Sequence, residues 1–67
     1  GLLIEYCHAK NFVNPKFLIS DVSGPDHQKL FEIHVKIGED IYPSGIGMEK
    51  KSAEQSAAKN ALEILQD

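Results

Sequence analysis

The run LFEIHVKI at residues 30–37 constrains the fold most, because apolar and polar side chains alternate in it without a break. Phe31, Ile33, Val35 and Ile37 are the apolar members. Successive side chains of a strand point to opposite faces, so this run predicts a strand with one buried face and one solvated face. Strands of this kind are typical of antiparallel sheets that are covered on one side.

The C-terminal stretch predicts the element that covers such a sheet. Residues 50–65 contain neither Gly nor Pro and are rich in alanine, a strong helix former. One helical stripe holds Ala53, Ala57, Ala61 and Ile64. Ala58, Leu62 and Leu65 lie beside that stripe. Small alanine side chains allow a helix to lie close against a sheet.

A second, shorter helix is expected at the N-terminus, over residues 2–10. Leu3, Tyr6 and Cys7 fall on one stripe of it. The opposite stripe consists of Gly1, Ile4, Glu5 and His8. Asn11 tolerates the left-handed conformation and is expected to end the helix.

Two further strands complete the expected fold. Residues 16–22 are rich in strand-forming residues and lead into a turn at Ser23–Asp26. Residues 41–44 predict a third strand, placed at a sheet edge because Pro43 has no N–H to donate. The order is α-β-β-β-α, an α+β fold with a three-stranded antiparallel sheet and both helices on one face.

Size and composition exclude several classes of function. A chain of 67 residues forms one domain, and its carboxylates are too dispersed for a catalytic or metal site. Cys7 is the only cysteine, so it is expected to be a small core residue in a protein of a reducing compartment, the cytoplasm. The longest apolar run, Leu2–Ile4, is far too short to span a membrane. A binding domain is therefore expected rather than an enzyme.

The segment GIGMEKK at residues 45–51 is the best candidate for a binding site. Gly45 and Gly47 allow a close backbone approach, and the expected helix start presents unpaired N–H groups with partial positive charge. Lys50 and Lys51 add two full charges at the same point. This arrangement suits a phosphate, although a tight turn with two solvated lysines has the same pattern.

The spacing of several motifs resembles that of the double-stranded-RNA-binding domain. The shared features are Pro15-x-Phe17, Gly24-Pro25-Asp26-His27, the G-x-G-x-x-KK-x-A string and the Ala57-Ala58-x-x-Ala61-Leu62 string. The strings GPDHQKLF and SAEQSAAKNAL resemble the C-terminal domain of ribonuclease III most. The resemblance covers the whole chain, residues 1–67.

The resemblance implies three RNA-contacting regions. The helix at 2–10 and the loop after residue 23 would each enter a minor groove, and the lysine pair would contact phosphates across the major groove between them. The domain would read A-form shape over about 16 base pairs with little sequence preference. The residues that match the family's RNA-binding positions are Ile4, Glu5, His8, Gly24, Pro25, Asp26, His27, Gly47, Lys50 and Lys51.

Departures from the family pattern predict weak affinity for the isolated chain. Ile4 stands where ribonuclease III often has glutamine, Glu49 where a helix-capping serine is usual, and Glu54 where a third lysine is common. The chain has no arginine and a formal net charge of −3. We therefore expect binding to depend on a further domain or on dimerisation.

The resemblance also implies a larger parent protein. In ribonuclease III, acidic residues and magnesium in a separate upstream domain cut the RNA, so this chain is expected to bind RNA, to need no cofactor and to have no catalytic residue. A homodimer through the parent's catalytic domain is expected as well. The alternative is a domain of the same fold that mediates protein interaction or dimerisation, with weak or lost RNA binding.

Overall fold

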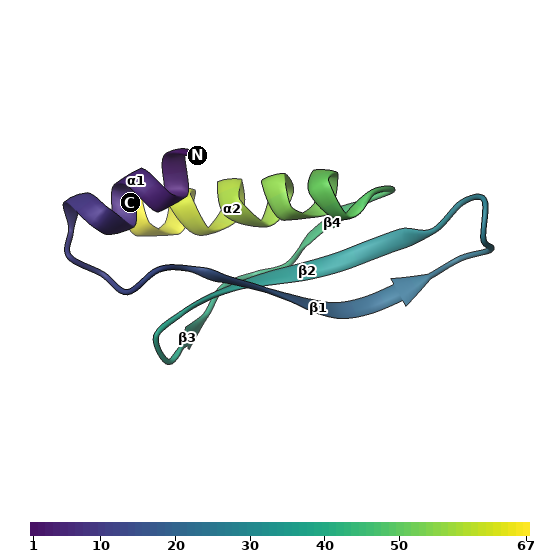
Figure 1. Cartoon of the computed structure of the whole chain (residues 1–67), viewed down its shortest axis with the longest axis horizontal. Coiled ribbons are helices and arrows are strands. Elements are labelled where there is room, and N and C mark those ends of the chain that lie inside the picture. Colours follow the sequence, from purple (N-terminus) through teal and green to yellow (C-terminus); the bar gives the residue numbers. More distant parts are fainter.

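A computed structural model describes residues 1–67, and it contains two helices and a four-stranded antiparallel sheet. Both helices lie on the same side of the sheet, and α2 runs along it (Figure 1). The α+β arrangement expected from the sequence is thus confirmed, with one more strand than predicted. The elements are α1 (Leu2–Ala9), β1 (Lys16–Ser23), β2 (Leu30–Ile37), β3 (Asp40–Ile41), β4 (Gly45–Gly47) and α2 (Lys50–Gln66).

The strand β2 is the centre of the sheet. It pairs with β1 from Leu30 to Lys36 on one side and with both β3 and β4 on the other. The apolar residues of its alternating run face the helices, and Ile33, Val35 and Ile37 are buried. The residues between them form the opposite, outer face of the sheet.

The prediction of one continuous third strand at residues 41–44 is wrong. The chain forms β3 and β4 instead, and Tyr42–Ser44 between them belongs to neither strand. Pro43 cannot donate to a sheet ladder, which explains why pairing stops there. The prediction that Pro43 lies at a sheet edge is confirmed, since β3 and β4 pair only with β2.

Side chains replace the missing ladder hydrogen bonds at this break. His34 Nδ1 donates to the Tyr42 carbonyl oxygen at 3.0 Å, and Asn60 Nδ2 donates to the Ser44 carbonyl oxygen at 3.0 Å. The Ser44 hydroxyl donates to Glu32 Oε2 at 2.7 Å. His34 lies on the face of β2 that was expected to be solvated, whereas the structure makes it half-buried and hydrogen-bonded.

The core depends on how closely α2 approaches the sheet. Ala53, Ala57 and Ala61 are fully buried, as the alanine stripe predicted. A Cβ atom added to Gly45 would collide with the backbone of Ala57, so only glycine fits at that crossing. The small residues on both sides therefore bring helix and sheet backbones together.

The C-terminal turn of α2 departs from the predicted stripe at Ile64. This side chain is 49% exposed, whereas Leu65 packs against the core. A step of three residues from Ala61 turns the helix back by roughly 60°, away from the side on which α1 lies. Tyr6 of α1 donates its hydroxyl to the Leu65 carbonyl oxygen at 3.0 Å and fixes the two helices together.

The ends of the elements follow the expected backbone chemistry. Asn11, two residues after the end of α1, adopts a positive φ of 60°, as its residue type predicted. Neither helix is both long and apolar enough to span a lipid bilayer.

Candidate nucleic-acid interface

The outward stripe of α1 is exposed, as expected. Glu5 and His8 are open to solvent, and Ile4 is 42% exposed. Leu3 and Cys7 on the opposite side are buried and hold this stripe outward. His8 Nε2 donates to Asn14 Oδ1 at 2.8 Å, so the ring is oriented by the segment that leads into β1. The stripe therefore offers one carboxylate and one oriented imidazole.

The β1–β2 loop projects beyond the covered part of the sheet. Gly24 adopts a positive φ of 90°, and an added Cβ would lie 2.5 Å from the Gln28 carbonyl oxygen. The Gln28 N–H donates to the Pro25 carbonyl oxygen at 2.9 Å and closes the turn. Asp26 and His27 are exposed at this turn. Glycine and proline thus shape a loop that presents two polar side chains.

The first turn of α2 carries the positive charge of the candidate interface. Lys50 and Lys51 are exposed, because the helix turns Ala53 toward the sheet. Glu49 occupies the N-cap position in an extended conformation, and its side chain makes no capping hydrogen bond. The N-terminal N–H groups therefore keep their partial positive charge beside the two lysines.

The structure changes the explanation of the two glycines before α2. Gly45 is buried and Gly47 half-buried, and the space above both is filled by α2. A Cβ at Gly47 would lie 2.7 Å from the Ala53 nitrogen. The close approach that these glycines permit is thus to the helix. A direct RNA contact of Gly47 stays a prediction.

The three regions are distributed along the length of the molecule. Figure 1 shows α1 at one end, the β1–β2 loop at the other, and the start of α2 between them. The longest dimension of the domain is 40 Å and the other two are 20 and 18 Å. The carboxylate and imidazole of α1 and the His27 loop thus flank a central pair of lysines.

One more exposed cation lies close to the loop. Lys29 directly precedes β2 and is open to solvent. Lys29 lies within the GPDHQKLF string but is not among the residues matched to the family's RNA-binding positions. Its sequence position, two residues after His27, was the available signal.

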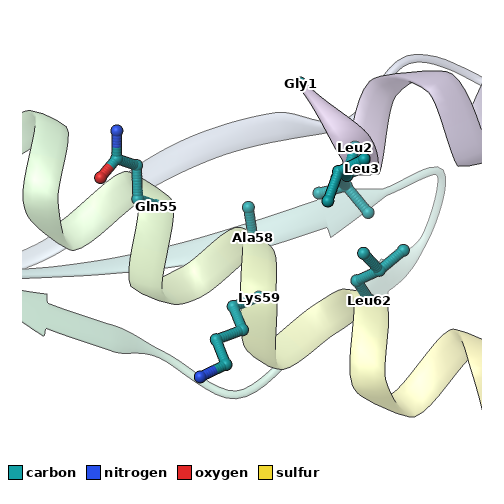
Figure 2. Close-up of a pocket in the computed structure, with 7 residues that line it drawn as sticks. All are labelled: Gly1, Leu2, Leu3, Gln55, Ala58, Lys59 and Leu62. Atoms are coloured by element: carbon teal, nitrogen blue, oxygen red, sulfur yellow. The ribbon is translucent and has the colours of Figure 1, made fainter.

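A separate apolar groove lies between the start of α1 and the middle of α2. Leu2, Leu3, Ala58 and Leu62 face one another there, whereas the Lys59 amine points away (Figure 2). The groove has a volume of about 290 Å³. Its lining offers no array of donors or charges for phosphates, so we place it outside the candidate interface.

The single cysteine of the chain lies in the core. The Cys7 side chain is fully buried, and burial raises the pKa of its thiol. A thiol held in this way is protonated and unreactive at neutral pH. No cluster of three or more His, Cys, Asp or Glu side chains is positioned to hold a metal ion.

Comparisons with known proteins agree with this geometry. Residues 1–65 match the family described as "Double-stranded RNA binding motif". The chain is 39% identical over 66 residues to Ribonuclease 3 of Myxococcus xanthus, covering 98% of the chain and 25% of that protein. It is 44% identical over 61 residues to Ribonuclease 3 of Allorhizobium ampelinum, covering 91% of the chain and 26% of the relative. The chain thus spans about a quarter of the length of these relatives.

Solved structures agree with the sequence matches. The Arabidopsis HYL1 structure superimposes with a TM-score of 0.84 at 36% identity, over 98% of this chain and 93% of that one. The first double-stranded-RNA-binding domain of HYL1 gives a TM-score of 0.79 at 36% identity, over the same shares of the two chains. The family match covers residues 1–65 and the whole fold superimposes on solved members, so the chain belongs to the double-stranded RNA binding motif family.

Proposed function

We propose that this chain binds double-stranded RNA through three exposed regions: the outward stripe of α1, the β1–β2 loop and the first turn of α2. The observation that carries the proposal is the exposed Lys50–Lys51 pair at the N-terminus of α2, in a chain that matches the family over residues 1–65. A helix N-terminus with two lysines attracts phosphates without reading sequence.

The order of the three regions along the molecule supports a different kind of RNA contact for each of them. Glu5 and His8 on α1, and His27 in the loop, would meet the minor-groove edges and 2′-hydroxyls at either end. The lysine pair between them would contact the phosphates that border the major groove. Among the remaining proposed contacts, Ile4, Gly24, Pro25 and Gly47 shape the surfaces and carry no charge, whereas Asp26 presents an exposed carboxylate.

We also propose that the parent protein is of the ribonuclease III type. The identity to Ribonuclease 3 proteins, of which the chain spans about a quarter, supports this assignment. Cleavage, the magnesium it uses and homodimerisation would then belong to another domain of the parent, in the cytoplasm. This chain would hold the RNA and need no cofactor of its own.

Titration of the 67-residue chain with three matched nucleic acids tests the proposal. Duplex RNA should bind more tightly than duplex DNA or single-stranded RNA of the same sequence at one salt concentration, because only A-form RNA presents 2′-hydroxyls in a wide minor groove. Equal affinity for the two duplexes would contradict it. Addition of magnesium should cause no cleavage of the bound RNA.

A protein-interaction function is the second candidate, favoured by the net charge of −3. It is distinguished by the same titration at low salt, where electrostatic binding to duplex RNA is strongest. Absence of binding at about 20 mM salt would favour the interaction function over RNA binding.

A further inference from the structure

The outer face of the sheet, turned away from both helices, is not covered by any other element. Figure 1 shows α1 and α2 together above the strands and no segment below them. Leu18 on this face is 42% exposed, although it lies in the middle of the long β1–β2 pair. The six central residues of the outer face are Lys16, Leu18 and Asp21 on β1, and Glu32, His34 and Lys36 on β2.

The charges of the outer face are paired in an unfavourable way within one molecule. Lys16 is directly opposite Lys36 at one end of the pair, and Asp21 is directly opposite Glu32 toward the other end. Like charges opposite each other destabilise a sheet. The fold alone therefore gives no reason for two such pairs, one basic and one acidic, on the same face.

We propose that the outer face docks onto the outer face of a second copy of this chain. The two-fold axis of the pair lies midway between the two sheets and perpendicular to the strands, over the line that joins Leu18 and His34. Rotation by 180° about this axis reverses each strand and leaves it above its own counterpart. Lys16 then faces Asp21 of the second copy, and Lys36 faces Glu32 of the second copy.

The same rotation also brings the apolar residues of the two outer faces together. Ile41 on β3 is paired with Lys36 at the basic end, and Ile46 on β4 is paired with Glu32 at the acidic end. The rotation therefore brings Ile41 of one copy over Ile46 of the other. These side chains are 62% and 59% exposed in the single chain. Charge and apolar surface are thus complementary under a single two-fold operation.

This complementarity favours a second copy over an RNA on the same face. Phosphates would be attracted to Lys16 and Lys36 but repelled by Asp21 and Glu32 at the other end. The surface proposed for RNA lies on the helix side and in the β1–β2 loop, so self-association and RNA binding are independent proposals. The exposed apolar part of the outer face consists of few side chains, chiefly Leu18, Ile41 and Ile46, so we expect a weak association with a Kd on the order of 0.1–1 mM.

A charge-swap experiment tests the proposal with exposed residues only. Sedimentation velocity and NMR diffusion at up to about 1 mM chain, in low salt, measure self-association at this affinity. Lys16→Glu alone and Asp21→Lys alone should each weaken it at least about tenfold, because each places like charges at both symmetric contacts. An equimolar mixture of the two variants should associate again, since both contacts in the mixed pair are then of opposite charge.

Lys59→Glu is the matched control, because it makes the same charge change on α2, outside the outer face. It should leave self-association within about twofold of the unmodified chain. Glu32 is not substituted because it also accepts the Ser44 hydrogen bond at the strand break. A chain that stays monomeric at every concentration, or a mixture of variants that fails to associate, would overturn the proposal. Self-association that survives both single variants would place the interface elsewhere.

Discussion

The helix α2 has two regions that use the same backbone for different purposes. Its first turn carries Lys50 and Lys51 in solvent, whereas Ala53, Ala57 and Ala61 on the next turns are fully buried. The lysines contribute charge and little packing. The alanines contribute packing and no charge. Recognition and stability are thus separated along one helix, and substitutions in one region should leave the property of the other unchanged.

The largest effect is expected at Gly45 of β4, which packs against the buried region of α2. Gly45→Ala should lower the free energy of unfolding by about 3 kcal/mol or more, because the new methyl group would collide with the Ala57 backbone. Urea denaturation followed by circular dichroism measures this loss. Ser52→Ala, on the exposed side of the same helix, is the control and should change stability by less than about 0.5 kcal/mol. Equal stability of the glycine variant would contradict the close-packing argument.

In the exposed region, the combined substitution Lys50→Ala and Lys51→Ala should weaken duplex RNA binding by roughly tenfold or more. The slope of log affinity against log salt should become shallower by about 1.8, the value for two lost phosphate contacts. Titrations at several salt concentrations measure both quantities.

The stability of this double variant should stay within about 0.5 kcal/mol of the parent chain. Lys59→Ala, farther along α2, is the control: it shows the effect of losing one lysine charge outside the candidate interface. If affinity and salt slope were both unchanged while the fold stayed intact, the lysine pair would be a solvated helix start and nothing more.

A smaller loss is expected where α2 is tied to the strand break. Asn60→Ala removes the hydrogen bond to the Ser44 carbonyl oxygen and should cost about 1 kcal/mol of stability. Thermal unfolding detects this as a lower Tm. RNA affinity, measured well below that temperature, should not change, because Asn60 lies far along the helix from the lysines. A fall in affinity without a fall in Tm would contradict the proposed separation of RNA binding and stability between the two regions.

The smallest effect, and the only gain, is expected at Glu54. This half-buried residue follows Ala53 one turn after Lys50. Glu54→Lys should tighten duplex RNA binding a few-fold and steepen the salt slope by about 0.9, because one more cation then faces the phosphates. Glu54→Gln should give an intermediate gain, since it removes the negative charge without adding a positive one. Weaker binding of both variants would contradict the expectation.

The elements with regular periodicity could be predicted from the sequence because each is specified by its own residues. The alternation around Ile33 and the alanine spacing of α2 need no knowledge of the rest of the fold. Asn11 ended α1 through its own backbone preference. The strand break at Tyr42–Ser44 could not be predicted in this way. Its hydrogen bonds come from His34 and Asn60, which only the folded chain brings to it.

In the candidate site, too, the features set by local sequence could be predicted and those set by tertiary contacts could not. Exposure of Lys50, Lys51 and His27 follows from local pattern and was expected. The glycines before α2 were expected to allow the close approach of a ligand; the space above both is filled by the helix, and an RNA contact of Gly47 stays a prediction. A glycine pattern shows that something approaches the backbone closely, but whether that is a ligand or the protein itself depends on the tertiary arrangement. Ile64 is exposed for a related reason, because the position of α1 decides which side of the last turn is covered.

The irregularities of the outermost strands also affect how the protein behaves at high concentration. On one edge, Ser20 forms a bulge in β1 and donates its hydroxyl to the Glu32 carbonyl oxygen at 3.2 Å. On the other edge, Pro43 separates two strands of only two and three residues. Neither edge therefore presents a long, regular row of free N–H and C=O groups that a foreign strand could extend. The domain is protected in this way against fibril-like growth by strand addition, even where its concentration is high.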